Sequence, residues 1–353
     1  MTLRVAMAQV AARVGDVDGN VETILDGWKR AADAGADVVV FTELTITGYP
    51  PEDLLLKPEF LDATERALAT LCERGPAGTV AVVGTVAAVG DREHVDDEEP
   101  GDVAVSALDL RNRAVAIADG QVVAAYDKWR VPNYGVFDEA RYFVPDDDAC
   151  VIRVRGVPVG LTVCEDLWTE QGPVAQSAQH GARVIVNLNA SPWERGKRAD
   201  REAWVRHHAT RDGTFVVYVN VVGGQDDVVF DGDSMLCAPD GEVVARGAQF
   251  AEDLVVVDLD VDPAEVDGPA LDGFTGDRPE LEPHVPADRL DDVAEVWQAL
   301  VRATGDYVRR NGFEEVIVAL SGGIDSAVVA AIAADALGGD HVLGVLLPSP
   351  YSS

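Results

Sequence analysis

The chain has 353 residues, 47% of them hydrophobic, which is enough for more than one core, so two domains are expected. Its 62 acidic and 28 basic residues give a formal net charge of −34, and a surface of that charge repels both nucleic acid and anionic membranes. No apolar run reaches the roughly 20 residues that span a bilayer, and the four cysteines lie far apart, so we expect a protein of the reducing cytoplasm without disulfides.

Short β-branched runs alternate with amphipathic segments along the first 260 residues. The runs predict strands at 3–10, 37–43, 79–86, 102–110, 157–166, 182–189, 214–222 and 253–260. The amphipathic segments predict helices at 18–34, 52–75, 168–180 and 196–212. Asp-Gly turns between alternating segments predict hairpins at 111–128 and 234–247. This mixture favours an α/β sandwich with antiparallel or mixed sheets over a purely doubly wound sheet.

The alternation of predicted strands and helices stops after residue 262, which divides the chain into two predicted domains. Residues 263–290 are rich in proline, glycine and acids without any period, which predicts a linker between a domain at 1–262 and a second one at 291–353. The second domain reads as a helix, a strand, a glycine turn, a helix and a strand, which together make a βαβ unit. One such unit is a small core for a nucleotide-binding domain, so we expect this domain to be incomplete.

Three polar residues follow separate predicted strands of the first domain. Glu43 ends the buried run "VVVFTE", Lys128 ends the first hairpin, and Cys164 ends "GLTVC". The ends of strands are where α/β folds gather catalytic groups, so these three side chains are expected to converge. Taken one at a time, the cysteine is more often packing, the glutamate a cap and the lysine a solvated hairpin end.

Together the three residues predict covalent hydrolysis of a carbon–nitrogen bond. Cys164 would attack a carbonyl or nitrile carbon, and Glu43 would take the thiol proton and pass it to departing ammonia. Lys128 and the backbone N–H after the cysteine would stabilise the oxyanion, and the lysine charge would favour the thiolate. The acids that follow Cys164 would anchor the turn and orient the substrate.

Four stretches carry a resemblance to a known family: "FTELTITGYPPEDLL", "DKWRVPNYGVFDEARYF", "GLTVCEDLW" and "NASPWERGKRADR". They resemble the nitrilase (carbon–nitrogen hydrolase) superfamily, and within it the glutaminase domains of glutamine-dependent NAD synthetases. The resemblance implies a nitrilase-like α-β-β-α sandwich with Glu43, Lys128 and Cys164 as its catalytic triad. It further implies a supporting role for Glu139 and contacts with glutamine from Tyr134, Glu165, Ser191 and Lys197.

The second domain carries the hexapeptide S-G-G-I-D-S between a β-branched strand and an alanine-rich helix. Its glycines allow a tight turn whose N–H groups, with the helix N-terminus, suit a pyrophosphate. A carboxylate in the turn repels phosphate unless a cation lies between them, which implies Mg²⁺ at Asp325. The residues expected to bind ATP are Ser321, Gly322, Gly323, Asp325 and Ser326.

This hexapeptide resembles the loop of the ATP pyrophosphatase group, and "GVLLPSPYSS" at 344–353 resembles the segment that follows it in NAD synthetases. The resemblance implies an incomplete Rossmann-like domain after the nitrilase-like one. Glutamine would be hydrolysed to glutamate and ammonia, and ammonia would amidate nicotinic acid adenine dinucleotide with ATP and Mg²⁺. Because the family's synthetase domain is longer, we expect only the glutaminase half to be complete, and this chain alone not to make NAD.

Two further interpretations remain open at this stage. The chain could be a free-standing amidase with a vestigial C-terminal segment, or a non-catalytic subunit that binds a separate synthetase chain. Association with such a chain, or a homo-oligomer, is the expected assembly. Ammonia release from glutamine without ATP separates the enzymes from the binding subunit, and a comparison of glutamine with aliphatic amides separates the two enzymes.

The acidic excess predicts how stability depends on salt. Acids are spread along the whole chain and only four of the basic residues are lysines, a composition typical of a cytoplasm with very high salt, although an ordinary acidic protein is the alternative. Because salt screens the repulsion among carboxylates, the melting temperature is expected to rise between dilute buffer and molar KCl. A melting temperature that is flat or falls with KCl would remove the halophilic interpretation.

Overall fold

The computed structural model describes residues 1–89, 109–282 and 284–347. Its helices are α1 (Val17–Asp33), α2 (Pro58–Arg74), α3 (Pro173–Gln179), α4 (Lys197–Asp212), α5 (Asp292–Arg310) and α6 (Ile324–Leu337). Its strands up to the middle of the chain are β1 (Thr2–Gln9), β2 (Val38–Val40), β3 (Val80–Val89), β4 (Asp109–Ala118), β5 (Gln121–Asp127), β6 (Cys150–Val154), β7 (Val157–Val163) and β8 (Val184–Asn189). The later strands are β9 (Phe215–Asn220), β10 (Val222–Gln225), β11 (Val228–Asp231), β12 (Met235–Cys237), β13 (Val243–Arg246), β14 (Asp253–Asp260), β15 (Ala270–Leu271), β16 (Val316–Leu320) and β17 (Val342–Leu346).

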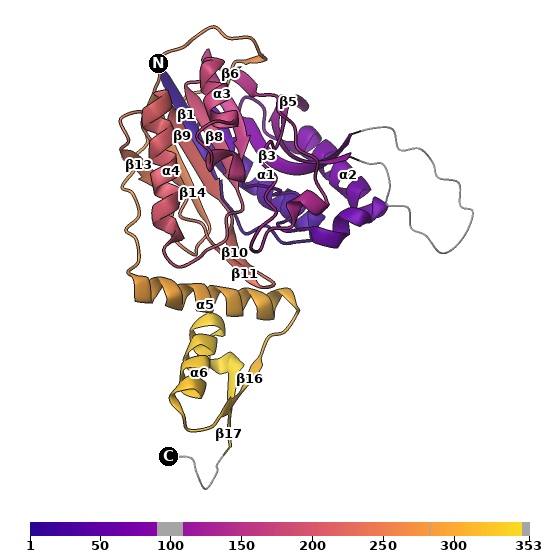
Figure 1. Cartoon of the computed structure of the whole chain (residues 1–353), viewed down its shortest axis with the longest axis vertical. Coiled ribbons are helices and arrows are strands. Elements are labelled where there is room, and N and C mark those ends of the chain that lie inside the picture. The colour runs from indigo at the N-terminus through magenta and orange to yellow at the C-terminus, as the bar shows by residue number, and fades with distance from the viewer. Residues whose placement is uncertain (90–108, 283, 348–353) are drawn as a thin grey trace, which may run out of the picture.

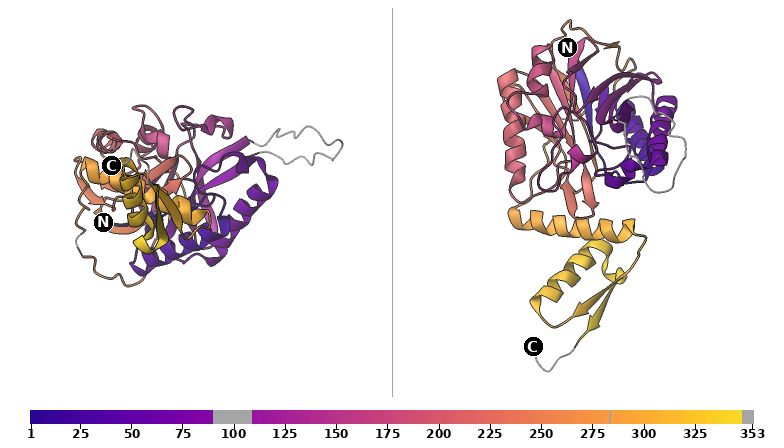
Figure 2. Two further views of the ribbon diagram at one scale, coloured as in Figure 1. Left: turned by 90° about the horizontal axis from the view of Figure 1, so that it is seen from below. Right: turned by 45° about the vertical axis from the view of Figure 1, so that its right-hand side comes forward.

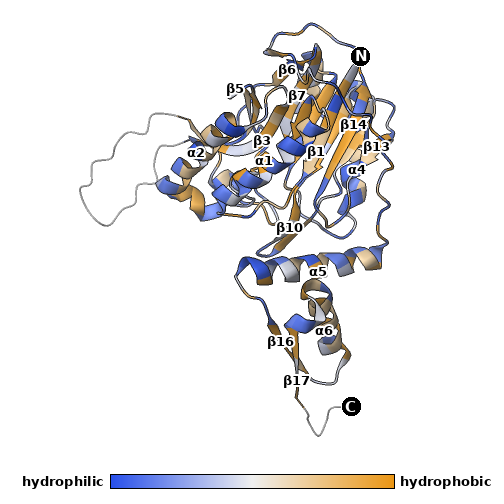
Figure 3. Ribbon diagram, turned by 180° about the vertical axis from the view of Figure 1, so that it is seen from behind, coloured by the Kyte–Doolittle hydropathy of each residue, from blue (hydrophilic) through white to orange (hydrophobic). Residues whose placement is uncertain are grey.

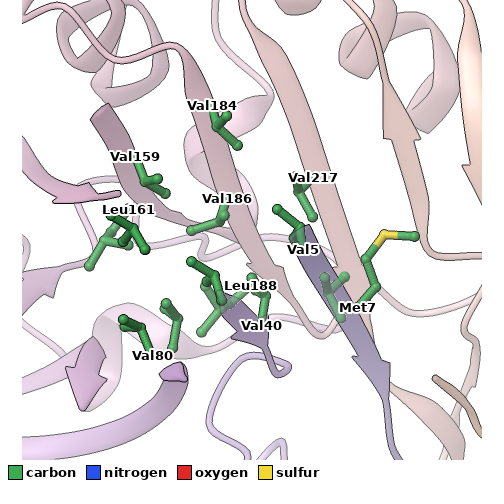
Figure 4. Packing of buried hydrophobic residues seen from close by; sticks show 14 of the residues in the cluster. Val5, Met7, Val40, Val80, Val159, Leu161, Val184, Val186, Leu188 and Val217 are labelled. Carbon is green, nitrogen blue, oxygen red and sulfur yellow. The ribbon is translucent and has the colours of Figure 1, made fainter. Parts of the chain in front are cut away.

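Two large mixed sheets pack face to face. One has the order β14-β1-β2-β3-β4-β5 and the other β13-β12-β9-β8-β7-β6-β15. Valines and leucines from both inner faces form one core between them, with Val5 and Val40 on one side and Val159, Val186 and Leu188 on the other (Figure 4). This core follows from the alternation of side chains along each strand, which sends every second residue inward.

Helices cover both outer faces of this pair of sheets. The apolar faces of α1 and α2 pack on the first sheet, while those of α3 and α4 pack on the second (Figure 1). Figure 3 shows the hydrophobic strands enclosed between helices that are mostly hydrophilic on the outside. The predicted nitrilase-like α-β-β-α sandwich is therefore confirmed, and none of the described helices has the length and apolar character needed to cross a membrane.

Several predicted elements differ from the observed ones, and the reasons are local. The helix expected at 52–75 is interrupted, because Pro58 has no N–H to continue a helix and instead begins α2 after a short 3₁₀ helix at Glu52–Leu56. The strand expected at 214–222 divides into β9 and β10, which belong to different sheets. The strand expected at 102–110 falls mostly outside the described residues.

The segment expected as a linker contacts the first domain. Its two-residue strand β15 pairs in parallel with β6 at the edge of the second sheet. Phe274 N–H donates to Asp37 at 3.0 Å, and Arg155 donates to the Phe274 carbonyl at 2.9 Å. A two-residue strand is too short to show a period, which is why the sequence pattern did not predict it.

The last described part of the chain follows α5, which lies across the hairpin β10–β11 (Figure 2). The Asp291 side chain caps α5 by accepting from the N–H groups of Val293 and Ala294. Strands β16 and β17 then pair in parallel around α6, as expected of a βαβ unit. Ile317 and its partner on β17, Leu343, share the face opposite the buried Val318 and are exposed.

Candidate active site

The fold brings Glu43, Lys128 and Glu139 into one buried cluster. Glu43 follows β2, Lys128 follows β5, and Glu139 begins a short 3₁₀ turn, and all three are at least 95% buried. Lys128 Nζ donates to Glu43 Oε1 at 2.7 Å and to the two Glu139 oxygens at 2.9 and 2.8 Å. One ammonium group is thus held between two carboxylates that are 96 residues apart in the chain.

The charged groups in this cluster shift one another's pKa values. Burial alone would lower the pKa of Lys128, but Glu139 and Glu43 reverse this and raise its pKa well above the ordinary value, so the lysine stays charged. Burial raises the pKa of Glu139 to about 7, and Lys128 opposes that rise. Lys128 therefore supplies a fixed positive charge.

Two residues that the sequence did not single out complete the cluster. Asn112 Nδ2, on β4, donates to Glu43 Oε1 at 2.7 Å and to Glu139 Oε2 at 3.3 Å. The Tyr49 hydroxyl donates to Glu139 Oε1 at 2.7 Å. The second Glu43 oxygen, Oε2, accepts from the backbone N–H of Ala190 at 2.9 Å. The one feature of the sequence that could have indicated Asn112 is a polar side chain at a buried position of a strand.

Cys164 lies directly after β7, at the start of a 3₁₀ turn, and is 3% exposed. Its φ of +44° is a left-handed conformation that non-glycine residues adopt rarely, and such positions gather at functional sites. Burial raises the pKa of its thiol well above the ordinary value, Glu43 adds to the rise, and Lys128 opposes it. Lys128 thus favours the thiolate, as expected, but burial and Glu43 outweigh it, so the resting thiol is protonated and needs a base.

The two acids after Cys164 have different positions. Asp166 is fully buried and anchors the turn, since its carboxylate accepts from Val163 N–H at 2.9 Å, Arg130 N–H at 2.8 Å and the Tyr126 hydroxyl at 2.7 Å. Glu165 points the other way and accepts from the exposed Tyr134 hydroxyl at 2.8 Å.

Asp166 also predicts a pH dependence of stability. Burial raises its pKa from 3.8 to about 6, so the folded state binds more protons than the unfolded state between these values, and ionisation costs stability as pH rises through this window. An asparagine cannot ionise, so Asp166→Asn is expected to be more destabilising at pH 4 than at pH 7, by up to about 3 kcal/mol. Urea titrations of both proteins at the two pH values measure this, and a difference that grows with pH would contradict it.

A cavity of about 420 Å³ opens in front of Cys164. The residues that line it include the predicted nucleophile, Cys164, and all four residues that the resemblance associated with glutamine: Tyr134, Glu165, Ser191 and Lys197. The lining also includes residues that the sequence did not indicate, namely Phe137, Trp168, Glu194, Arg195, Gly196 and Asp200. Acidic, basic and aromatic side chains therefore all line the cavity.

Lys197 is a half-buried basic residue of this cavity. Its Nζ lies 5.6 Å from the ring centre of Phe137 and 5.8 Å from that of Trp168, distances at which an ammonium is attracted to the ring face. Burial, followed by the charge of Arg201, lowers the pKa of Lys197. A carboxylate bound in the cavity would relieve both effects.

The S-G-G-I-D-S segment spans the turn before α6 and the first three residues of that helix, and its residues up to Asp325 are exposed. Gly322 has a φ of +86°, which a residue with a Cβ adopts only with strain. The Ser326 hydroxyl donates to the Gly323 carbonyl at 3.0 Å and lies 3.2 Å from the Ser321 hydroxyl. The N–H groups of Ser321 and Gly323 donate to the Ser326 and Ser321 hydroxyls at 3.2 and 3.4 Å, so a phosphate bound here would take the place of these contacts.

Asp325 lies in the first turn of α6. No three histidine, cysteine or acidic side chains form a metal-binding group in the part of the chain that the structure describes. A single carboxylate fits the way Mg²⁺ is bound with nucleotides, because that ion takes one or two carboxylates and completes its shell with phosphates and water.

Comparison with known proteins covers the whole chain. The carbon-nitrogen hydrolase family profile matches residues 4–266, and the NAD synthase family profile matches residues 296–353. The glutamine-dependent NAD(+) synthetase of Xanthomonas campestris pv. campestris (strain 8004) is 43% identical, over 100% of this chain and 58% of that protein.

Two solved structures are also similar. That of the glutamine-dependent NAD+ synthetase from Acinetobacter baumannii, in complex with adenosine diphosphate, has a TM-score of 0.84 and 36% identity, covering 100% of this chain and 61% of that one. That of an amidase from Nesterenkonia sp. AN1, with acrylamide added at its active-site cysteine, has a TM-score of 0.60 and 25% identity, covering 73% of this chain and 93% of that one. The chain thus spans about three-fifths of the length of both synthetases, and the resemblance to both families is confirmed.

Proposed function

Because the chain belongs to the carbon–nitrogen hydrolase family, we propose that its residues 1–262 hydrolyse the side-chain amide of glutamine to glutamate and ammonia. The observation that carries this proposal is a buried Glu-Lys cluster whose charges act on the Cys164 thiol, which itself lines a cavity with groups of both charges. Glutamine has an amide to react and an ammonium and a carboxylate to bind, and the cavity offers a partner for each.

The first half of the reaction acylates the cysteine. Glu43 takes the proton of the Cys164 thiol while the sulfur forms a bond to the amide carbon. The carbonyl electrons move to oxygen, and this oxyanion is stabilised by the charge of Lys128 and the N–H of Glu165. When the carbon–nitrogen bond breaks, the proton held by Glu43 passes to the nitrogen, and ammonia leaves a thioester behind.

The second half releases glutamate and restores the enzyme. Glu43 takes a proton from water while the oxygen of that water forms a bond to the thioester carbon. The bond from this carbon to sulfur then breaks, and the sulfur recovers a proton from Glu43. A base is required in both halves because the resting thiol is protonated. Asn112 and the N–H of Ala190 hold the Glu43 carboxylate in place through both.

Recognition of glutamine would depend on charge. Glu165, held by Tyr134, is the candidate partner for the α-ammonium group, while Lys197 and Ser191 are candidates for the α-carboxylate. A simple aliphatic amide has neither charge. The test is ammonia release by the purified chain from glutamine and from propionamide, without ATP. A kcat/KM for propionamide equal to that for glutamine would favour the free-standing amidase, and no ammonia from either would favour the non-catalytic subunit.

We further propose that the segment at 291–353, joined through residues 263–290, takes part in ATP-dependent amidation of nicotinic acid adenine dinucleotide by that ammonia. The match to the NAD synthase family and the exposed glycine turn before α6 support it. Ser321, Gly322, Gly323 and Ser326 would hold the phosphates, and Asp325 would hold Mg²⁺, whose role is to neutralise phosphate charge. Calorimetry of ATP binding with Mg²⁺ tests this, and binding unchanged in Asp325→Asn would exclude Asp325 from the site.

A further inference from the structure

One wall of the glutamine cavity contacts α5 as well as the first domain. Residues 194–197 form this wall, and the first three of them are exposed. Its backbone hydrogen bonds are internal, from Lys197 N–H to the Glu194 carbonyl and from Ala199 N–H to the Gly196 carbonyl. Gly196 has a φ of +89° and no atom of another residue near the place of a Cβ. The shape of the wall therefore depends on what fixes its two ends.

The first domain holds the backbone at both ends, since Trp193 N–H donates to the Val229 carbonyl at 2.7 Å and Arg198 belongs to α4. The side chains at both ends, however, contact the same carboxylate of α5. Trp193, just before the wall, donates from its indole Nε1 to Glu295 Oε1 at 3.0 Å. Arg198, just after it, places Nη1 2.9 Å from Glu295 Oε2. Glu295 lies in the first turn of α5 and is 3% exposed. A buried carboxylate that accepts from two donors five residues apart sets the distance between them.

Further hydrogen bonds hold the start of α5 and the residue before it, Leu290, against the first domain. Gln249 Nε2 donates to Glu295 Oε1 at 3.3 Å, and its Oε1 accepts from Leu290 N–H at 2.8 Å. Arg198 also donates to the Leu290 carbonyl at 2.8 Å. Leu290 and Glu295 thus approach the wall together, as one end of the helix that begins the C-terminal segment.

We propose that Glu295 is a positioning residue for the glutamine cavity, and that it makes the shape of the cavity depend on the docking of α5. This proposal rests on the proposed function and extends it, because it assigns regulation of the glutamine site to the segment that would use the ammonia. When α5 is docked, Glu295 holds Trp193 and Arg198 and so keeps the wall in place. When α5 moves, the Trp193 and Arg198 side chains lose this partner at once, and only the contacts with the first domain remain.

The variant that tests this is Glu295→Gln, which keeps the size of the side chain but removes the charge that Arg198 contacts. We expect the KM for glutamine to rise about tenfold while kcat stays within about threefold, because the wall contacts the substrate but not the reacting bond. The rate at which iodoacetamide alkylates Cys164 should stay within about twofold, since that small reagent needs no wall. Glu295→Asp, which keeps the charge, should recover part of the loss.

Asp292→Asn is the matched control, because it removes another carboxylate partner of Arg198 whose own side chain is 67% exposed. Its KM should stay within about twofold of the unaltered chain, as expected for a surface ion pair. Trp193→Phe, which loses only the indole N–H donor, should raise KM about threefold and serves if Glu295→Gln does not fold. A KM that is unaltered in Glu295→Gln, or in Trp193→Phe if the former does not fold, would overturn the proposal.

Hydrogen exchange separates this inference from the proposed function. Backbone amides of residues 193–199 should exchange at least about tenfold faster in Glu295→Gln, or in Trp193→Phe, than in the unaltered chain, whether or not glutamine is hydrolysed. If the unaltered chain releases no ammonia, the proposed function is wrong, but the exchange rates still test the positioning role of Glu295. Exchange at unchanged rates would overturn the positioning role even in an active glutaminase.

Discussion

Replacing Cys164 with alanine is expected to lower the rate of glutamine hydrolysis by a factor on the order of 10⁴ or more, because the covalent route loses its nucleophile. The fold should survive, since the side chain only loses a sulfur at the edge of the core. Ammonia release measures the rate, and near-ultraviolet circular dichroism measures the fold.

The control for this variant is Cys72→Ala, a free cysteine on α2 that lies in a different cluster. Its activity should be close to that of the unaltered chain. If Cys164→Ala kept a tenth of the normal rate, Cys164 could not be the nucleophile, whatever its position in the cavity.

Replacing Lys128 with methionine is the second large effect we expect. It leaves Glu43 and Glu139 buried beside each other without the cation between them, and breaking a buried ion pair in this way costs about 3–5 kcal/mol. Urea unfolding should show this loss, and glutamine hydrolysis should fall at least about a hundredfold because the oxyanion loses its charge partner.

Two further variants separate structure from catalysis at this position. In Lys128→Met/Glu139→Gln one of the stranded charges is gone, so part of the stability should return while activity stays lost. Lys29→Met on the exposed side of α1 is the matched control and should change stability by less than about 0.5 kcal/mol. A Lys128→Met chain as stable and active as the Lys29→Met chain would refute the buried cluster.

The sequence predicted the sandwich and the principal residues of the site because both depend on patterns over a few neighbouring residues. Alternation along a strand shows in every second residue, and the turns that follow strands place Glu43, Lys128 and Cys164 where parallel and antiparallel neighbours can meet. Those three are far apart in the chain, yet a resemblance over several short motifs was enough to group them with Glu139 and the cavity residues.

Other parts of the site could not be predicted because they exist only through tertiary contacts. Asn112 is an ordinary polar residue of a hairpin until the fold places it between two carboxylates. Glu295 reads as a solvated residue of an amphipathic helix, and only the docking of α5 buries it against Trp193 and Arg198. The balance of effects on the Cys164 thiol could not be predicted either, because Lys128 acts in the expected direction but burial outweighs it, and no sequence pattern measures burial at one atom.

The most direct test of the central claim is to trap the acyl intermediate. The purified chain is mixed with glutamine, quenched in acid over a series of short times, digested, and examined by mass spectrometry for a γ-glutamyl group on the peptide that carries Cys164. We predict that this thioester forms on Cys164 before steady ammonia release and is absent from the other three cysteines. Steady release of ammonia with Cys164 unmodified at every time, or with the group on another residue, would contradict the account.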